Sequence, residues 1–279
     1  MVGRFWRVGV AATSFCLIAS RVPAQFPPIT DPTKEEAKCE FSTGKTLVWF
    51  TSVKAKCVGT CIATWRMNNG PYAGCFGPGF TDLAANACVY GPVQGVEAKA
   101  RAAIVTKCNV AGQDSCPECY PAGQCGTGNP IVNTVESLID TVTEMIYCLE
   151  RAELTPTKAQ AKCEDGVANT LAKFARLKTK CYEKCNRNMM NGKIASGSCS
   201  PPFPADPATQ ACIFAPLKGA EARAAAAIDK VCANVPGATP PCYVPSFDTG
   251  VEWANWFEGL VDFTTSQVAC GAPSGAFLN

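Results

Sequence analysis

Two pairs of carboxylates stand out because the members of each pair lie four residues apart. Glu136 and Asp140 form the first pair, and Glu258 and Asp262 form the second. Paired carboxylates can act as acid and base in glycoside hydrolysis. On a helix, a spacing of four places both side chains on one face. We favour a solvated stripe opposite an apolar face, and a carboxylate-based secreted hydrolase is the third of our three functional hypotheses.

Closely spaced cysteines suggest a second kind of chemistry, either redox catalysis or metal binding. Cys116 and Cys119 form a C-x2-C pair, a spacing that redox enzymes place at a helix N-terminus. This pair lies in a loop rich in proline and glycine, without a βαβ pattern around it. Cys57 and Cys61 lie four residues apart and could bind a metal as thiolates. For both pairs we expect structural disulfides instead, so the sequence predicts no metal ligand and no cofactor.

The chain contains no histidine, which removes most mechanisms of nucleophilic and acid–base catalysis. Ser-His and Cys-His hydrolases need an imidazole to activate their nucleophile. The sequence also lacks a glycine-rich phosphate loop and a zinc signature. We therefore predict no catalytic residue, and a structural or binding protein without catalytic activity is the leading hypothesis.

Aromatic side chains support an alternative function, which is the carriage of a small hydrophobic ligand such as a lipid. Trp49, Trp65, Trp253, Trp256 and Phe257 could form an apolar surface for such a ligand. Packing in the core is the competing explanation, because large aromatic side chains dominate protein interiors. The crowding of the last three residues predicts that some of them are exposed.

The N-terminal residues have the pattern of a secretory signal. Arg4 and Arg7 precede a twelve-residue apolar stretch that is too short to span a bilayer, and small residues follow at Val22 and Ala24. We expect residues 1–24 to be cleaved, leaving a secreted or periplasmic chain without a membrane span. Cleavage removes three of the 25 basic residues and none of the 23 acidic ones. This near-neutral balance gives no reason to expect nucleic acid as a partner.

An internal repeat organises the eighteen cysteines that remain, an even number typical of a disulfide framework. Six cysteines recur at an offset of 124 residues, one at 123 and one at 122. We expect residues 25–152 and 153–279 to form two cysteine-rich modules. Cys116 and Cys125 occur only in the first module and predict a disulfide within their own loop. The predicted structural cysteines are Cys39, Cys57, Cys61, Cys75, Cys88, Cys108, Cys116, Cys119, Cys125, Cys148, Cys163, Cys181, Cys185, Cys199, Cys212, Cys232, Cys242 and Cys270.

The elements that carry these residues are predicted to be helical, which makes the fold class all-α. The first helix of each module is expected to start at Asp31-Pro32 or Thr155-Pro156, where an N-cap precedes a proline. It is expected to end at Asn69-Gly70 or Asn191-Gly192, because both residue types tolerate positive φ.

Two further helices complete each predicted module, giving about three helices joined by long loops rich in glycine and proline. A short alanine-rich helix is predicted over Val96–Cys108 and over Ala220–Cys232. The last helix has apolar residues at i, i+3 and i+4 from Ile131 to Leu149, and again from Trp253 to Val268.

The pairing of the cysteines is open, because eight cysteines in one module allow many connectivities. If the first and last helices are antiparallel neighbours, Cys39 would pair with Cys148. Cys57 and Cys61 share one helix face and could join the first helix to the short helix and to the loop that holds Cys119.

Lysine-rich amphipathic helices with spaced cysteines, as from Lys162-Cys163 to Lys180-Cys181 and Cys185, resemble cysteine-rich, helical, exported bacterial repeat proteins of no known activity. The resemblance covers both modules and names no functional residue. A weaker likeness links the chain to saposin-like and lipid-transfer helical bundles. The expected partner is an extracellular protein or surface, which two similar modules would bind bivalently, or a small apolar ligand.

Overall fold

The computed structural model describes residues 33–68, 72–77, 79–109, 115–117, 120, 123–126, 130–149, 155–195 and 197–268. Within these ranges the secondary structure is entirely helical, with eight α-helices and one short 3-10 helix. The predicted all-α class is therefore confirmed. The predicted signal, residues 1–24, lies outside the described residues, as do Cys119 and Cys270.

The helices follow one another in the same order in the two halves of the chain. The first half contains α1 (Lys34–Met67), a 3-10 turn (Tyr72–Cys75), α2 (Leu83–Tyr90), α3 (Val96–Cys108) and α4 (Pro130–Ile146). The second half contains α5 (Lys158–Met190), α6 (Pro207–Phe214), α7 (Ala220–Val231) and α8 (Gly250–Val268). Each half thus has four helices, because α2 and α6 occupy the segments that were expected to be long loops.

The two long helices begin at capping boxes rather than at the predicted proline positions. Thr157 caps α5: its hydroxyl accepts a hydrogen bond from the backbone N–H of Gln160, whose side chain accepts one from the Thr157 N–H. Thr33 and Glu36 cap α1 in the same way. The predicted N-cap at Thr155 is therefore wrong by two residues, because reciprocal bonds satisfy two free N–H groups at once.

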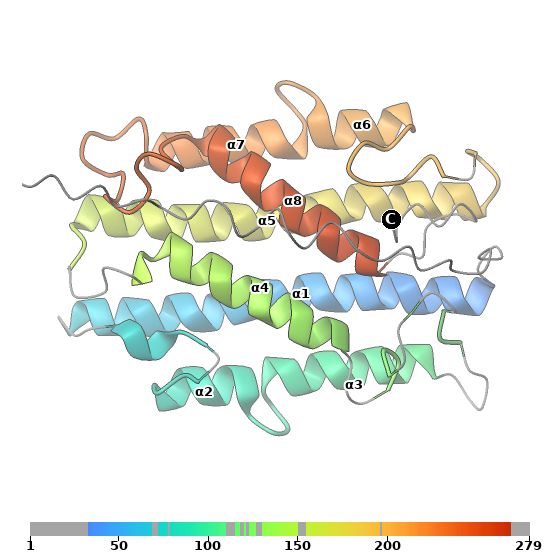
Figure 1. Ribbon diagram of the computed structural model, residues 1–279, viewed down its shortest axis with the longest axis horizontal. Coiled ribbons are helices and arrows are strands. Elements are labelled where there is room, and N and C mark those ends of the chain that lie inside the picture. Colours follow the sequence, from blue (N-terminus) through green and yellow to red (C-terminus); the bar gives the residue numbers. More distant parts are fainter. Residues whose placement is uncertain are drawn as a thin grey trace, which may run out of the picture.

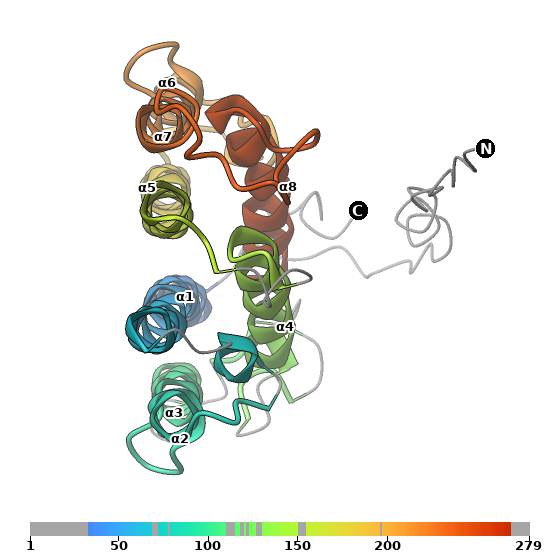
Figure 2. The same cartoon turned by 90° about the vertical axis from the view of Figure 1, so that its left-hand side faces the viewer.

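The helices form two layers. Helices α3, α1, α5 and α7 lie side by side in one layer, and α4 and α8 cross one face of it (Figures 1 and 2). The two central helices, α1 and α5, are antiparallel: Arg66 near the end of α1 pairs with Asp165 near the start of α5, with Nη1 and Oδ1 3.1 Å apart. The main apolar core continues across both halves, and the predicted division at residues 152 and 153 stays a prediction.

Eight disulfides connect the described cysteines, and three of them recur in the two halves with the same sequence separations of 69, 31 and 14. The recurring bonds are Cys39–Cys108, Cys57–Cys88 and Cys61–Cys75 in the first half, and Cys163–Cys232, Cys181–Cys212 and Cys185–Cys199 in the second. Cys116–Cys125 closes its own loop, as predicted. Cys148–Cys242 joins the two halves.

The predicted pairing of Cys39 with Cys148 is wrong because α1 and α4 run in the same direction rather than antiparallel. Tyr147, just after α4, lies against the guanidinium of Arg66 near the end of α1, with 5.5 Å between the ring centroid and Cζ. A helix of 34 residues is about 50 Å long, so Cys148 lies far from Cys39. The partners of Cys57 and Cys61 also differ from those we expected, since Cys57 forms a disulfide with Cys88 and Cys61 forms one with Cys75.

Candidate functional site

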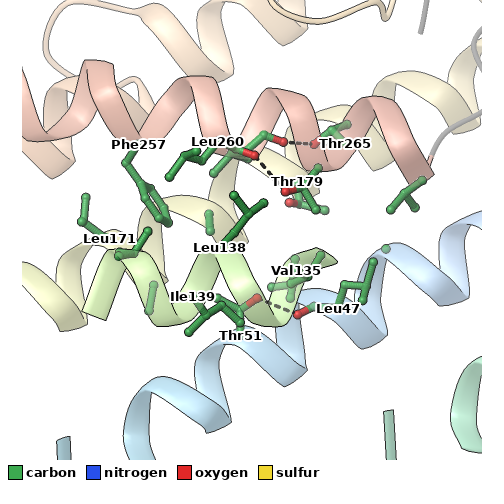
Figure 3. Close-up of a pocket in the computed structure, with 18 of the residues that line it drawn as sticks. Leu47, Thr51, Val135, Leu138, Ile139, Leu171, Thr179, Phe257, Leu260 and Thr265 are labelled. Carbon is green, nitrogen blue, oxygen red and sulfur yellow. Dashed lines mark hydrogen bonds between the residues drawn. The ribbon is translucent and has the colours of Figure 1, made fainter. Parts of the chain in front are cut away.

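A cavity of about 120 Å³ lies at the centre of the protein, where α1 and α5 of one layer meet α4 and α8 of the other (Figure 3). Its walls are mainly apolar. They include Gly44, Leu47, Val48 and Ala55 of α1, Val135, Leu138, Ile139 and Val142 of α4, Ala168, Leu171, Ala172 and Ala175 of α5, and Phe257, Leu260 and Val261 of α8. An apolar cavity lined in this way can accept a hydrocarbon ligand.

Unequal side-chain sizes in the two layers create the space. The facing surfaces of α1 and α5 carry small residues, among them Gly44, Ala168 and Ala172, which lack the bulk to fill the centre. Leucines of α4 and α8, Leu138 and Leu260, point into the cavity from the other layer (Figure 3). The cavity therefore lies where the two halves of the chain meet, and both halves contribute walls.

Threonine hydroxyls in the walls are satisfied within their own helices. Thr51 donates to the carbonyl of Leu47 at 2.9 Å, Thr264 to that of Leu260 at 2.8 Å and Thr265 to that of Val261 at 2.7 Å. Dashed lines mark these bonds in Figure 3. Because the donors are used in this way, these wall positions are less polar than their residue types suggest.

One end of the cavity is polar. Glu40 of α1 and Glu183 and Asn186 of α5 line it. These residues share one end because α1 and α5 are antiparallel, and the charge of Lys45 on α1 acts directly on Glu183. Burial raises the pKa of Glu183, and the nearby positive charges of Lys45 and Arg187 oppose that shift.

The opposite end of the cavity is apolar. Leu171 and Phe257 lie together there, while Thr179 and Thr265 lie toward the other end (Figure 3). The ring of Phe257 also packs at a tilt against Phe174, with centroids 6.3 Å apart. The cavity is thus amphipathic along its length.

The predicted carboxylate pairs lie outside the cavity walls and are bound by buried lysines. The ammonium of Lys54 contacts Glu136 at 2.9 Å and Asp140 at 2.7 Å. The side chain of Lys54 has no exposed surface, and Asp140 is also buried. Burial raises the pKa of Asp140, and Lys54 opposes the shift. The solvated stripe that we expected is therefore wrong for this pair.

The second half repeats this arrangement. The fully buried ammonium of Lys178 contacts Glu258 and Asp262, each at 2.6 Å. Burial raises the pKa of Asp262 to about 6, although the charge of Lys178 works against this. These carboxylates are paired structural groups, and none of the four is among the described residues that line the cavity.

The sequence-based prediction missed both lysines, although a signal for them existed. Lys54 lies four residues after Phe50 and three before Cys57, which places it on the apolar face of the first helix. Lys178 occurs 124 residues later, on the matching face of α5. A lysine on a buried face needs carboxylate partners, because an unpaired buried charge is very costly.

The predicted aromatic surface is not gathered in one place. Among Trp49, Trp65, Trp253, Trp256 and Phe257, only Phe257 is among the described cavity residues. Trp49 is 41% exposed, and Trp65 and Trp256 are partly buried. Trp253 is buried and stacks on Phe247 with ring centroids 4.5 Å apart, in a cluster that also contains Tyr243.

Three cysteine sulfurs lie close enough to one another to resemble a metal site. The Sγ atoms of Cys39, Cys108 and Cys125 are within 4.8 Å of one another, and those of Cys39 and Cys125 are 3.9 Å apart. All three belong to disulfides, Cys39–Cys108 and Cys116–Cys125. Metal binding requires the thiolate form, so these oxidised sulfurs form two packed disulfides instead.

Comparison with known proteins supplies no relative. No family model, curated protein or solved structure matches this chain. Among the described helices, none has both the length and the apolar character that crossing a bilayer requires. The function must therefore be inferred from the geometry of the cavity.

Proposed function

We propose that the protein is a secreted, disulfide-stabilised binding protein without catalytic activity, and that it carries a small apolar ligand between α1, α4, α5 and α8. The disulfides favour an oxidising, extracytoplasmic environment. The predicted signal at residues 1–24 supports secretion. An extracellular protein or surface as a further partner stays a prediction.

The observation that carries this proposal is the apolar cavity at the centre of a disulfide-linked bundle. Protein interiors are normally closely packed, and an empty apolar cavity lowers stability in proportion to its volume. Here disulfides hold both central helices: Cys57–Cys88 and Cys61–Cys75 fix α1, and matching bonds fix α5. Such a frame can keep the space open, and a ligand gains about 0.8 kcal/mol for each methylene group that it buries there.

A substitution that fills the cavity with a larger side chain tests the proposal. The oxidised full-length chain, purified from its own source, is first analysed by native mass spectrometry for a retained apolar molecule. The stripped protein is then titrated with N-phenylnaphthylamine, a neutral apolar fluorophore. We expect Leu138→Trp to abolish saturable binding, because Leu138 points into the cavity. Leu217→Trp is the matched control, since Leu217 is 86% exposed.

The two variants separate cavity binding from adsorption to the surface. Loss of binding in Leu138→Trp together with normal binding in Leu217→Trp supports the carrier function. Equal binding by both variants and the wild type, or the absence of saturable binding in the wild type, contradicts it.

A further inference from the structure

The cavity is long and narrow, which limits the shape of the ligand. Its lining positions on α5 run from Ala168 to Asn186, a span of about 27 Å at 1.5 Å per residue. On α1 they run from Glu40 to Ala55, or about 22 Å. A volume of about 120 Å³ distributed over such a length suits one extended hydrocarbon chain.

A buried polar atom marks where the ligand's head would lie. The side-chain oxygen Oδ1 of Asn186 is buried and accepts no hydrogen bond from any described residue. Asn186 lines the polar end of the cavity beside Glu183. A buried acceptor without a donor is costly, so a ligand that supplies a hydroxyl or N–H group at this point gains affinity.

Charge at the same end selects the type of head. Glu40 and Glu183 both line this end of the cavity, and Glu40 is buried. Lys45, Arg187 and Lys180 act on Glu183 but are not among the described residues that line the cavity. A carboxylate or phosphate head would therefore meet like charge at a partly desolvated end of the cavity, whereas a neutral or cationic head would not.

We propose that the ligand is a single-chain amphiphile whose head donates hydrogen bonds and carries no negative charge, such as a long-chain alcohol or amine. Its head contacts Asn186, and its chain extends toward Leu171 and Phe257. This inference rests on the proposed carrier function and adds the chemical class and orientation of the ligand.

Four probes with the same chain length test the head group on the oxidised full-length protein. Dodecanol, dodecylamine, dodecane and dodecanoate compete with bound N-phenylnaphthylamine at neutral pH. We expect dodecanol and dodecylamine to bind at least about tenfold more tightly than dodecanoate, because the anion is desolvated beside carboxyl groups. We expect dodecane to bind more weakly than dodecanol, because it leaves the Asn186 acceptor unpaired.

The variant Asn186→Leu tests the contact itself. It should weaken dodecanol binding about fivefold to tenfold, the effect of losing one hydrogen bond, and leave dodecane binding unchanged. Asn255→Leu is the matched control, because Asn255 is exposed on α8. If Asn186→Leu fails to fold, the ranking of the four probes on the wild type decides the question.

The possible results distinguish this inference from the proposed function. If Leu138→Trp abolishes binding of the probes, but the wild type binds dodecanol and dodecanoate equally, the head-group inference is refuted and the carrier function stands. Tighter binding of dodecanoate than of dodecanol also refutes it. If no probe displaces the fluorophore and the fluorophore itself does not saturate, both proposals fail.

Discussion

Replacement of Lys178 by methionine should destabilise the protein far more than replacement of an exposed lysine on the same helix. Lys178 is fully buried, and its ammonium contacts Glu258 and Asp262 at 2.6 Å each. Methionine keeps most of the side-chain volume but leaves both carboxylates buried without a counter-charge. Removal of one partner from a buried ion pair typically costs about 3–5 kcal/mol of unfolding free energy. We expect a loss of about that size at pH 7.

The loss of unfolding free energy caused by Lys178→Met should be smaller at lower pH, and the direction of this change follows from the pKa of Asp262. That pKa is already raised to about 6 with Lys178 present, and it will rise further without the lysine. A carboxyl with a raised pKa binds its proton more tightly in the folded state, so folding becomes more favourable as the pH falls toward the carboxyl's ordinary pKa. Each pKa unit corresponds to about 1.4 kcal/mol, so the variant should recover about 1–3 kcal/mol between pH 7 and pH 5.

Guanidinium unfolding with the disulfides intact, followed by circular dichroism at both pH values, measures this difference. Lys180→Met is the control, because Lys180 is exposed on the same helix. Combining Lys178→Met with Glu258→Gln and Asp262→Asn should restore most of the stability, since no buried charge then remains. A loss below about 1 kcal/mol at pH 7, or the same loss at both pH values, would refute the reasoning about buried charge.

Three more predictions concern other parts of the fold. Burial raises the pKa of Glu164 to about 7, so the contribution of Glu164 to the unfolding free energy is largest in acid and is lost as the pH rises from about 4.5 to 7. Over that range the unfolding free energy of Glu164→Gln should change by about 2 kcal/mol less than that of the wild type. Gly250→Ala should lower the melting temperature, because a Cβ there meets the backbone of α7, whereas Gly259→Ala on the same helix meets nothing and should raise stability by about 0.5–1 kcal/mol. The repeat matches Cys119 with Cys242 and Cys270 with Cys148, and Cys148 and Cys242 are bonded to each other. Non-reducing peptide mapping should therefore recover Cys119 and Cys270 in one cross-linked peptide, and any other partner for either cysteine contradicts that pairing.

The residue pattern was sufficient to predict the long helices and their apolar faces. Leu47 and Phe50 lie at helical spacing and are buried, and the predicted range Val96–Cys108 coincides with α3. The short helix α2 escaped prediction because eight residues carry little periodicity and glycine and proline surround them. Its N-cap, Asp82, which accepts a hydrogen bond from the N–H of Ala85, was the available signal.

The candidate site could not be predicted from sequence because it depends on how the two halves pack. Its walls combine residues more than a hundred positions apart, such as Leu47 and Leu171, which no local pattern connects. The direction of α4 relative to α1 was equally hidden, and the wrong assumption about it produced the wrong partner for Cys148. The predicted ligand surface was based on large aromatic residues. The cavity arises instead from small residues of α1 and α5, which lie across from the layer that contains Leu138.

The disulfide between Cys148 and Cys242 changes what a single proteolytic cut can do to this molecule. It connects the residue just after α4 to the segment before α8, and so it bypasses the stretch of chain between α4 and α5. A protease that severs that stretch after Cys148 would leave two fragments that remain covalently attached and keep the four central helices together. Damage at this place would be invisible on a non-reducing gel and would separate the fragments only after a reductant is added.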